Sequence, residues 1–171
     1  PILCMLVYEM LGGKDEDEIL PLAASYELIH TATLIHDDIN DNSKVRRGVK
    51  ALHEVYGRAE AQITGDWLFV QGFGIGGRYS GNIVDIMSAS CAQLASAELK
   101  QISHIYDANI AVKDYYEIIE GKTAGPFSSG CEVAALLADS SEDVRESMGV
   151  FGMQLGLAFQ FKALKGFYSN L

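Results

Sequence analysis

Apolar residues recur at helical spacing along most of this chain, and that pattern limits the folds it can adopt. Between Leu20 and Ile35, apolar and small residues return every three or four positions, as on one face of an amphipathic helix. Residues 83–105 and 115–137 are also rich in helix formers. No stretch alternates between apolar and polar residues for long enough to require a sheet. The pattern predicts one all-α domain over residues 1–171.

Residues with special backbone or capping preferences mark the expected helix boundaries. Gly121, Gly125 and Pro126 fall inside the third of these stretches and should bend or interrupt its helix. The acidic run at 15–18 supplies negative charge near a helix start, and the polar run at 139–142 is typical of a loop that leads into a helix cap.

Composition excludes several classes of protein. Of the 171 residues, 49% are hydrophobic and 21% are charged, which is typical of a globular domain. A net charge of −10 argues against a nucleic-acid binder, which needs basic patches. No apolar run reaches about 18 residues, so no transmembrane segment is expected. The three cysteines (Cys4, Cys91 and Cys131) form no CxxC pair, which favours a reducing cytoplasmic location over a disulfide framework or a structural zinc site.

Three carboxylates directly follow the first helical stretch. On a helix, Asp37 and Asp41 are one turn apart and face the same way, with Asp38 rotated by about 100°. Like charges at this spacing repel each other by about a few tenths of a kcal/mol per pair. A cation should therefore offset them, and the candidates are the nearby pair Arg46 and Arg47 or a divalent metal. Oxygen-only ligands suit Mg²⁺, which retains waters and also binds phosphates.

Two other interpretations use the same cluster. An EF-hand calcium loop that starts at Asp38 needs glycine and glutamate where the sequence has Ser43 and Val49, so this interpretation fails. A solvated acidic helix end, salt-bridged to Arg46 and Arg47, stays open on the residues alone. Acids that hold Mg²⁺ beside arginines that hold phosphate are, however, the ingredients of a diphosphate site.

The segment from His30 to Gly48 (HTATLIHDDINDNSKVRRG) resembles the first aspartate-rich region of trans-isoprenyl diphosphate synthases, the polyprenyl synthetase family that includes geranylgeranyl diphosphate synthases. Further resemblances follow in order at Gly65-Asp66, Ala95–Glu98, Gly121–Ala124 and Phe159-Gln160. The resemblance implies an isoprenoid synthase-type helical bundle around a deep central cavity, usually assembled as a homodimer. It also implies a Mg²⁺-dependent prenyltransferase that condenses isopentenyl diphosphate with an allylic diphosphate, to geranylgeranyl diphosphate or a longer product.

The same resemblance implies roles for individual residues. The three aspartates would hold Mg²⁺ and act in catalysis together with Lys122. The allylic diphosphate would contact Arg46, Lys122, Thr123 and Gln160.

Isopentenyl diphosphate would contact His30 and Arg47. Four residues on the helix before the aspartates would form the wall that limits product length: Tyr26, Ile29, Ala32 and Thr33. Because Ala32 and Thr33 are small, the growing chain should pass them, and Tyr26 would be the lower stop.

Two parts of the family pattern are absent. A basic Gly-Lys-Arg segment should precede Pro1, and a second aspartate motif should follow Gln160, yet no acidic residue occurs after Glu146. We therefore expect the sequence to be incomplete at its N-terminus and after Gln160.

Three alternatives come from other classes of protein. One is a catalytically weak partner subunit of a heteromeric prenyl synthase, and another is a terpene cyclase. The third is a Rossmann oxidoreductase, because Gly72, Gly74 and Gly77 have the glycine spacing and Glu98 follows about 20 residues on. The third match is weak, because Glu98 lies in a helical stretch. We expect these glycines to mark a loop or a helix break.

Overall fold

The computed structural model describes residues 1–105, 107 and 109–168, with side chains up to Lys162. The described residues form helices joined by turns, with one hairpin of two short strands, which confirms the predicted all-α class. The chain divides into two compact units, Glu16–Tyr79 in one and Ile2–Asp15 with the residues from Ser80 onward in the other. That the units belong to one domain stays a prediction. None of the described helices has the length and apolarity needed to cross a membrane.

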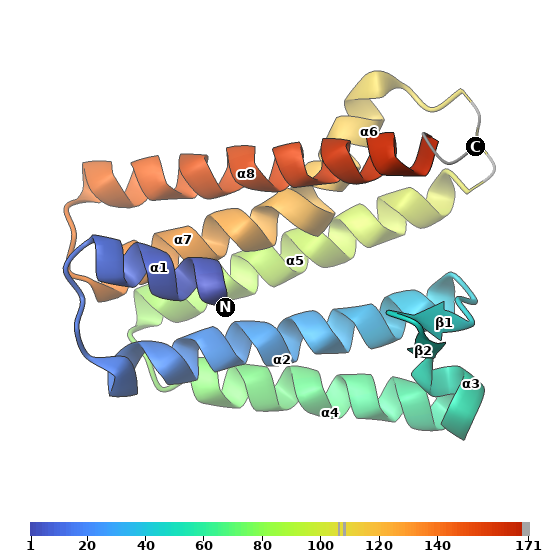
Figure 1. Ribbon diagram of the computed structural model, residues 1–171, viewed down its shortest axis with the longest axis horizontal. Coiled ribbons are helices and arrows are strands. Elements are labelled where there is room, and N and C mark those ends of the chain that lie inside the picture. Colours follow the sequence, from blue (N-terminus) through green and yellow to red (C-terminus); the bar gives the residue numbers. More distant parts are fainter. Residues whose placement is uncertain (106, 108, 169–171) are drawn as a thin grey trace. The chain divides into compact units, whose positions relative to one another are not determined.

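The unit Glu16–Tyr79 is built on two long helices that pack along each other (Figure 1). A hairpin and a short helix connect them. Its elements are α2 (Glu16–Asn40), β1 (Val45–Arg46), β2 (Val49–Lys50), α3 (Leu52–Tyr56) and α4 (Arg58–Gly76).

Glycines on α4 let the two long helices approach closely. A Cβ atom added to Gly72 would lie 2.7 Å from Cγ1 of Ile29 and 3.0 Å from the carbonyl oxygen of Ser25. A Cβ on Gly65 would overlap the His36 ring in the same way. The helix continues through Gly72 and ends at Gly76, so the expected loop or break is wrong for most of this glycine stretch. Gly65 and Gly72 serve helix packing, and the all-α fold excludes the Rossmann alternative.

Arg47 and Gly48 form the turn between β1 and β2. Val45 pairs with Lys50, and Arg46 pairs with Val49, which leaves a two-residue turn. Both turn residues have positive φ, 51° at Arg47 and 84° at Gly48. Such a turn twists as the strands do and favours glycine at its second position. The strands have two residues each, too few for a periodic signal in the sequence.

The second unit is centred on α7, which packs against α1, α5 and α8. The predicted helix over 83–105 is confirmed as α5, and the predicted helix start after residues 139–142 is confirmed as α8. The expected interruption within 115–137 is a π-helical turn, η1, between α6 and α7. The elements are α1 (Ile2–Met10), α5 (Gly81–Ser103), α6 (Val112–Ile119), η1 (Glu120–Ala124), α7 (Gly125–Leu137) and α8 (Glu142–Tyr168).

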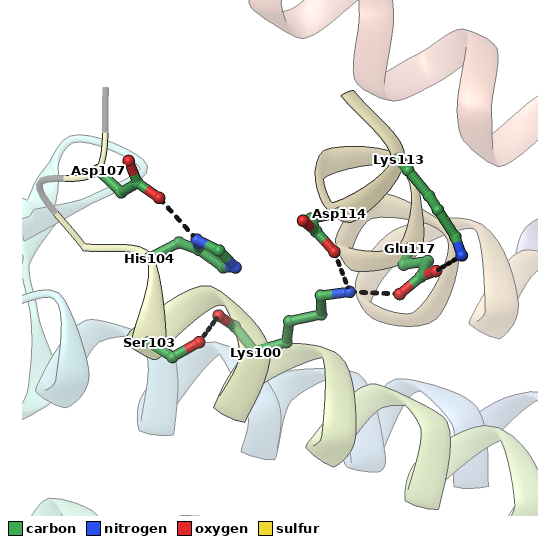
Figure 2. A network of polar contacts seen from close by, with 7 residues as sticks. All are labelled: Lys100, Ser103, His104, Asp107, Lys113, Asp114 and Glu117. Atoms are coloured by element: carbon green, nitrogen blue, oxygen red, sulfur yellow. Dashed lines mark hydrogen bonds and ion pairs between the residues drawn. The ribbon is translucent and has the colours of Figure 1, made fainter. Parts of the chain in front are cut away.

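A network of ion pairs joins the end of α5 to α6 (Figure 2). Lys100 Nζ lies 2.6 Å from Asp114 Oδ1 and also pairs with Glu117, which Lys113 contacts from the other side. Hydrogen bonds from the Lys100 ammonium hold the pKa values of Asp114 and Glu117 below their ordinary range, and the two carboxylates raise the pKa of Lys100. The network ties α6 to the end of α5, and α6 leads directly into η1.

Candidate functional site

The three aspartates lie where α2 ends. Asp37 and Asp38 belong to its last turn, and the backbone N–H of Asp41 donates to the carbonyl of Asp37 at 2.8 Å. Asn42 has a φ of 51°, and the N–H of Ser43 donates to the carbonyl of Asp38 at 3.0 Å, as in a Schellman cap. Because a helix carries its negative partial charge at this end, three carboxylates here repel the helix dipole as well as each other.

Arg46, on β1, offsets part of this charge. Its Nε donates to Asp38 Oδ1 at 2.9 Å, and its Nη2 pairs with the same oxygen. The Asp38 side chain is 6% exposed, and its hydrogen bond raises the pKa of Arg46. The salt-bridge interpretation left open by the sequence therefore holds for Arg46. Asp38 faces this arginine because it is rotated by about 100° from Asp37 along the helix.

A second arginine acts on the same helix end, and the sequence analysis missed it. Arg58, the first residue of α4, donates from Nη1 to Asn42 Oδ1 at 2.7 Å and from Nη2 to the carbonyl oxygen of Ile39 at 3.0 Å. The sequence contains one sign of this role. Arg58 places a positive charge at the start of α4, where such a charge is unfavourable for α4 itself.

The donor chemistry of the helix end fits a hard divalent cation. Asp37 is partly exposed and Asp41 is exposed, one helical turn apart on one side of α2. Within the part of the chain that the structure describes, no three acidic, histidine or cysteine side chains converge as ligands of one ion. Mg²⁺ needs no such group, since it usually takes one or two carboxylates and fills its shell with waters and phosphate oxygens.

His30 and Arg47 lie on exposed parts of the same unit. Partial desolvation lowers the pKa of His30. The charge of Glu27 opposes this shift, while Arg47 and Arg46 add to it. Joint recognition of an anion by His30 and Arg47 stays a prediction.

The four predicted wall residues are rotated from Asp37 around α2 by increasing amounts. At about 100° per residue, Tyr26 and Thr33 lie within about 40° of Asp37, Ile29 lies about 80° from it, and Ala32 lies about 140° from it. Ile29 is buried against Gly72 of α4, and Ala32, which is fully buried, lies on the same side as Ile29. Thr33 is therefore the position at which a larger side chain would change the wall without entering the packed face between α2 and α4.

In the second unit, Lys122 and Thr123 are carried by η1. Lys122 Nζ lies 2.6 Å from Glu98 Oε2 on α5, and the two side chains are 20% and 13% exposed. Thr123 Oγ1 lies 3.5 Å from Oε1 of Gln160 on α8, at the long limit of a hydrogen bond. The structure thus brings Thr123 and Gln160 together and gives Lys122 a carboxylate partner.

Glycine contacts fix the π-helical turn from two sides. A Cβ on Gly121 would lie 2.7 Å from Cβ of Ala97 on α5. A Cβ on Gly156 of α8 would lie 2.5 Å from Cα of Ala124. Short π-helical segments are frequent at functional sites because they displace side chains from the regular helical register. The signal for this contact is the spacing of Gly149, Gly152 and Gly156, which the sequence analysis did not use.

Comparison with known proteins decides the family. The polyprenyl synthetase family model matches residues 1–162, which include both groups of predicted site residues. The chain belongs to the polyprenyl synthetase family. The family that the aspartate and arginine motifs predicted is thereby confirmed.

Named relatives differ in the product that they make. The chain is 33% identical over 169 residues to a short chain isoprenyl diphosphate synthase of Methanocaldococcus jannaschii. This match covers 95% of this chain and 50% of that protein. It is 36% identical over 140 residues to a chloroplastic solanesyl-diphosphate synthase of Oryza sativa, covering 81% of this chain and 35% of the relative. Geranylgeranyl and octaprenyl diphosphate synthases also match, so the family alone does not fix product length.

Solved structures share the helical arrangement. A polyprenyl synthase from Caulobacter crescentus, in complex with calcium and isoprenyl diphosphate, matches with a TM-score of 0.90 and 35% identity. The match covers 94% of this chain and 49% of that chain. The chain therefore spans about half the length of the relatives that it matches.

The close approach at Gly156 predicts the stability of two matched variants. Gly156→Ala should lower the free energy of unfolding by about 1–3 kcal/mol, because its Cβ meets backbone atoms of η1. Gly74→Ala adds the same methyl group within α4, where no atom lies within 4 Å, and should raise stability by about 0.5–1 kcal/mol. Urea unfolding followed by circular dichroism measures both. Equal effects of the two substitutions would contradict the packing account.

Proposed function

We propose that this protein is a Mg²⁺-dependent prenyltransferase that condenses isopentenyl diphosphate with an allylic diphosphate. The observation that carries the proposal is the end of α2, where Asp37 and Asp41 lie one turn apart beside the ion pair of Asp38 and Arg46. Carboxylates at the negative end of a helix lower stability, and a cationic ligand explains their presence. Family membership supplies the reaction class.

The proposed reaction begins when the allylic C–O bond breaks and its electron pair leaves with the diphosphate. The π electrons of isopentenyl diphosphate then form the new carbon–carbon bond, and the resulting cation loses a proton. Mg²⁺, when held by Asp37 and Asp41, would supply charge stabilisation for the leaving diphosphate. Asp38, which Arg46 holds in this structure, would be the third carboxylate available to the metal.

The chain's own cations would bind the two substrates. Arg46, together with Lys122, Thr123 and Gln160, is proposed to contact the allylic diphosphate. His30 and Arg47 are proposed to contact isopentenyl diphosphate. Fixed guanidinium and ammonium groups favour the bond-breaking step because they stabilise negative charge as it develops. Lys122 pairs with Glu98, and the allylic diphosphate would compete with this carboxylate for the ammonium group.

Geranylgeranyl diphosphate or a longer product is the proposed outcome. Supporting it, Thr33 lies one turn before Asp37 and is small, so the wall at this level leaves space for the prenyl chain. Tyr26 lies two turns further along the same side and is the proposed lower stop. Ile29 and Ala32 would shape the wall indirectly, by setting how α2 packs against α4.

The assembly and the location of the protein are also proposals. Ile63, Trp67 and Val70 form an exposed apolar row at helical spacing on α4, as a homodimer interface would. A cytoplasmic location is supported by three free cysteines, Cys4, Cys91 and Cys131, whose thiol pKa values burial raises to about 12, 11 and 11.

The double variant Asp37→Ala/Asp38→Ala tests the proposed activity. The purified protein is incubated with Mg²⁺, labelled isopentenyl diphosphate and allylic starters, and the prenyl product is measured. We expect kcat/KM to fall by at least about 100-fold, because charge on the leaving group loses its stabilisation. Asp85→Ala, an exposed aspartate on α5, is the control and should keep full activity. Activity that survives the double substitution would rule out the metal role, and a wild-type protein without turnover would favour the weak-subunit alternative.

Product length tests the wall. Thr33→Phe should shorten the main product by one or more isoprene units, because a ring placed one turn before Asp37 blocks the chain. Ala24→Phe is the matched control, since Ala24 is exposed on the opposite side of α2. Chromatography of the products gives the distribution. An unchanged product from Thr33→Phe would show that the wall lies elsewhere.

A further inference from the structure

We propose that Arg58 is a positioning residue for the carboxylates at the end of α2. This inference rests on the proposed function, and it concerns a residue from another element of the same unit. Arg58 bridges two acceptors on the chain that surrounds Asp41: the carbonyl oxygen of Ile39 and the side chain of Asn42. Its guanidinium therefore holds the segment on both sides of Asp41.

The first contact compensates for a helix end. The last carbonyl groups of a helix have no partner within the helix. Arg58 Nη2 donates to one of them, the carbonyl of Ile39, at 3.0 Å. A positive charge at this place also counters the negative end of the helix dipole, which three carboxylates reinforce.

The second contact fixes the residue that terminates α2. Asn42 adopts a left-handed conformation with φ of 51°, and Arg58 Nη1 holds its side-chain oxygen at 2.7 Å. Because Asn42 is the neighbour of Asp41, holding its side chain limits the conformations of the Asp41 backbone. Asp41 is exposed, and its backbone N–H bonds to Asp37. Arg58 thus supports the geometry between Asp37 and Asp41.

The position of Arg58 agrees with this role. It is the first residue of α4, where a positive charge is unfavourable for α4 itself. A residue that breaks a local rule while it satisfies groups on another element is expected at functional sites. An arginine fork can donate to two acceptors at once, which a lysine ammonium cannot do with the same fixed geometry.

The experiment measures the Mg²⁺ concentration that gives half-maximal binding of inorganic pyrophosphate, by isothermal titration calorimetry on the purified protein. Arg58→Lys keeps the charge but loses the fork, and we expect this concentration to rise about tenfold, as for other residues that orient metal ligands. Arg58→Met removes the charge. Electrostatics alone would lower the Mg²⁺ requirement of this variant, whereas loss of positioning raises it.

Controls separate this role from general stability. Arg78→Lys makes the same change at an exposed arginine just after α4 and should leave the Mg²⁺ requirement unchanged. Asn42→Gly keeps the positive φ but removes the acceptor, so it should raise the Mg²⁺ requirement, and adding Arg58→Lys should add less than its effect alone. Thermal unfolding establishes that each variant is folded at the assay temperature.

The outcomes distinguish the two proposals. A wild-type protein that binds no pyrophosphate at any Mg²⁺ concentration would overturn the proposed function itself. Wild-type binding with an unchanged Mg²⁺ requirement in folded Arg58→Lys, or a lowered requirement in Arg58→Met, would overturn the positioning role and leave the proposed function standing.

Discussion

The placement of three carboxylates at the negative end of α2 is the constraint on which the rest of the site depends. A helix that ended in lysine or arginine would be more stable, because those charges complement the helix dipole. This helix ends in Asp37, Asp38 and Asp41, and arginines from two other elements offset part of the charge. Arg46 reaches Asp38 from β1, while Arg58 reaches the backbone end of the helix from α4. The hairpin and the start of α4 are thus tied to the acidic helix end.

Close helix packing through glycine holds both groups of predicted site residues. In one unit, Gly72 brings α4 against Ile29 on the helix that carries the aspartates. In the other, Gly121 and Gly156 hold the turn that carries Lys122 between α5 and α8. A glycine within a helix costs about 1 kcal/mol relative to alanine, so repeated glycines at contact points indicate that close approach outweighs helix propensity. Of the three glycines whose spacing resembles a nucleotide-binding motif, Gly72 is the one that this packing explains.

Much of the fold could be predicted from the sequence because it depends on local patterns. Helical periodicity predicted α2, and a high content of helix formers predicted α5. The glycines with Pro126 predicted an interruption that the structure shows as η1. The polar run before Glu142 predicted the start of α8. The strands of the hairpin could not be predicted, because two residues carry no period.

The sequence could nominate candidate site residues, but it could not give the contacts that these residues make. The aspartates, Arg46 and Arg47 stand in one continuous motif that local reasoning can read. Arg58 and Glu98 act across elements, so their partners depend on how helices pack, which one sequence does not reveal. That Ile29 packs against α4 likewise became clear once α4 was placed beside the helix.

Anomalous diffraction from crystals grown with Mn²⁺ and a non-reactive allylic diphosphate analogue tests the central claim most directly. Manganese replaces magnesium at oxygen ligands and its position can be measured independently of the protein atoms. The account predicts an anomalous peak bound by carboxylate oxygens of Asp37 and Asp41 and by the diphosphate. An ordered diphosphate with no peak beside these two aspartates would contradict it.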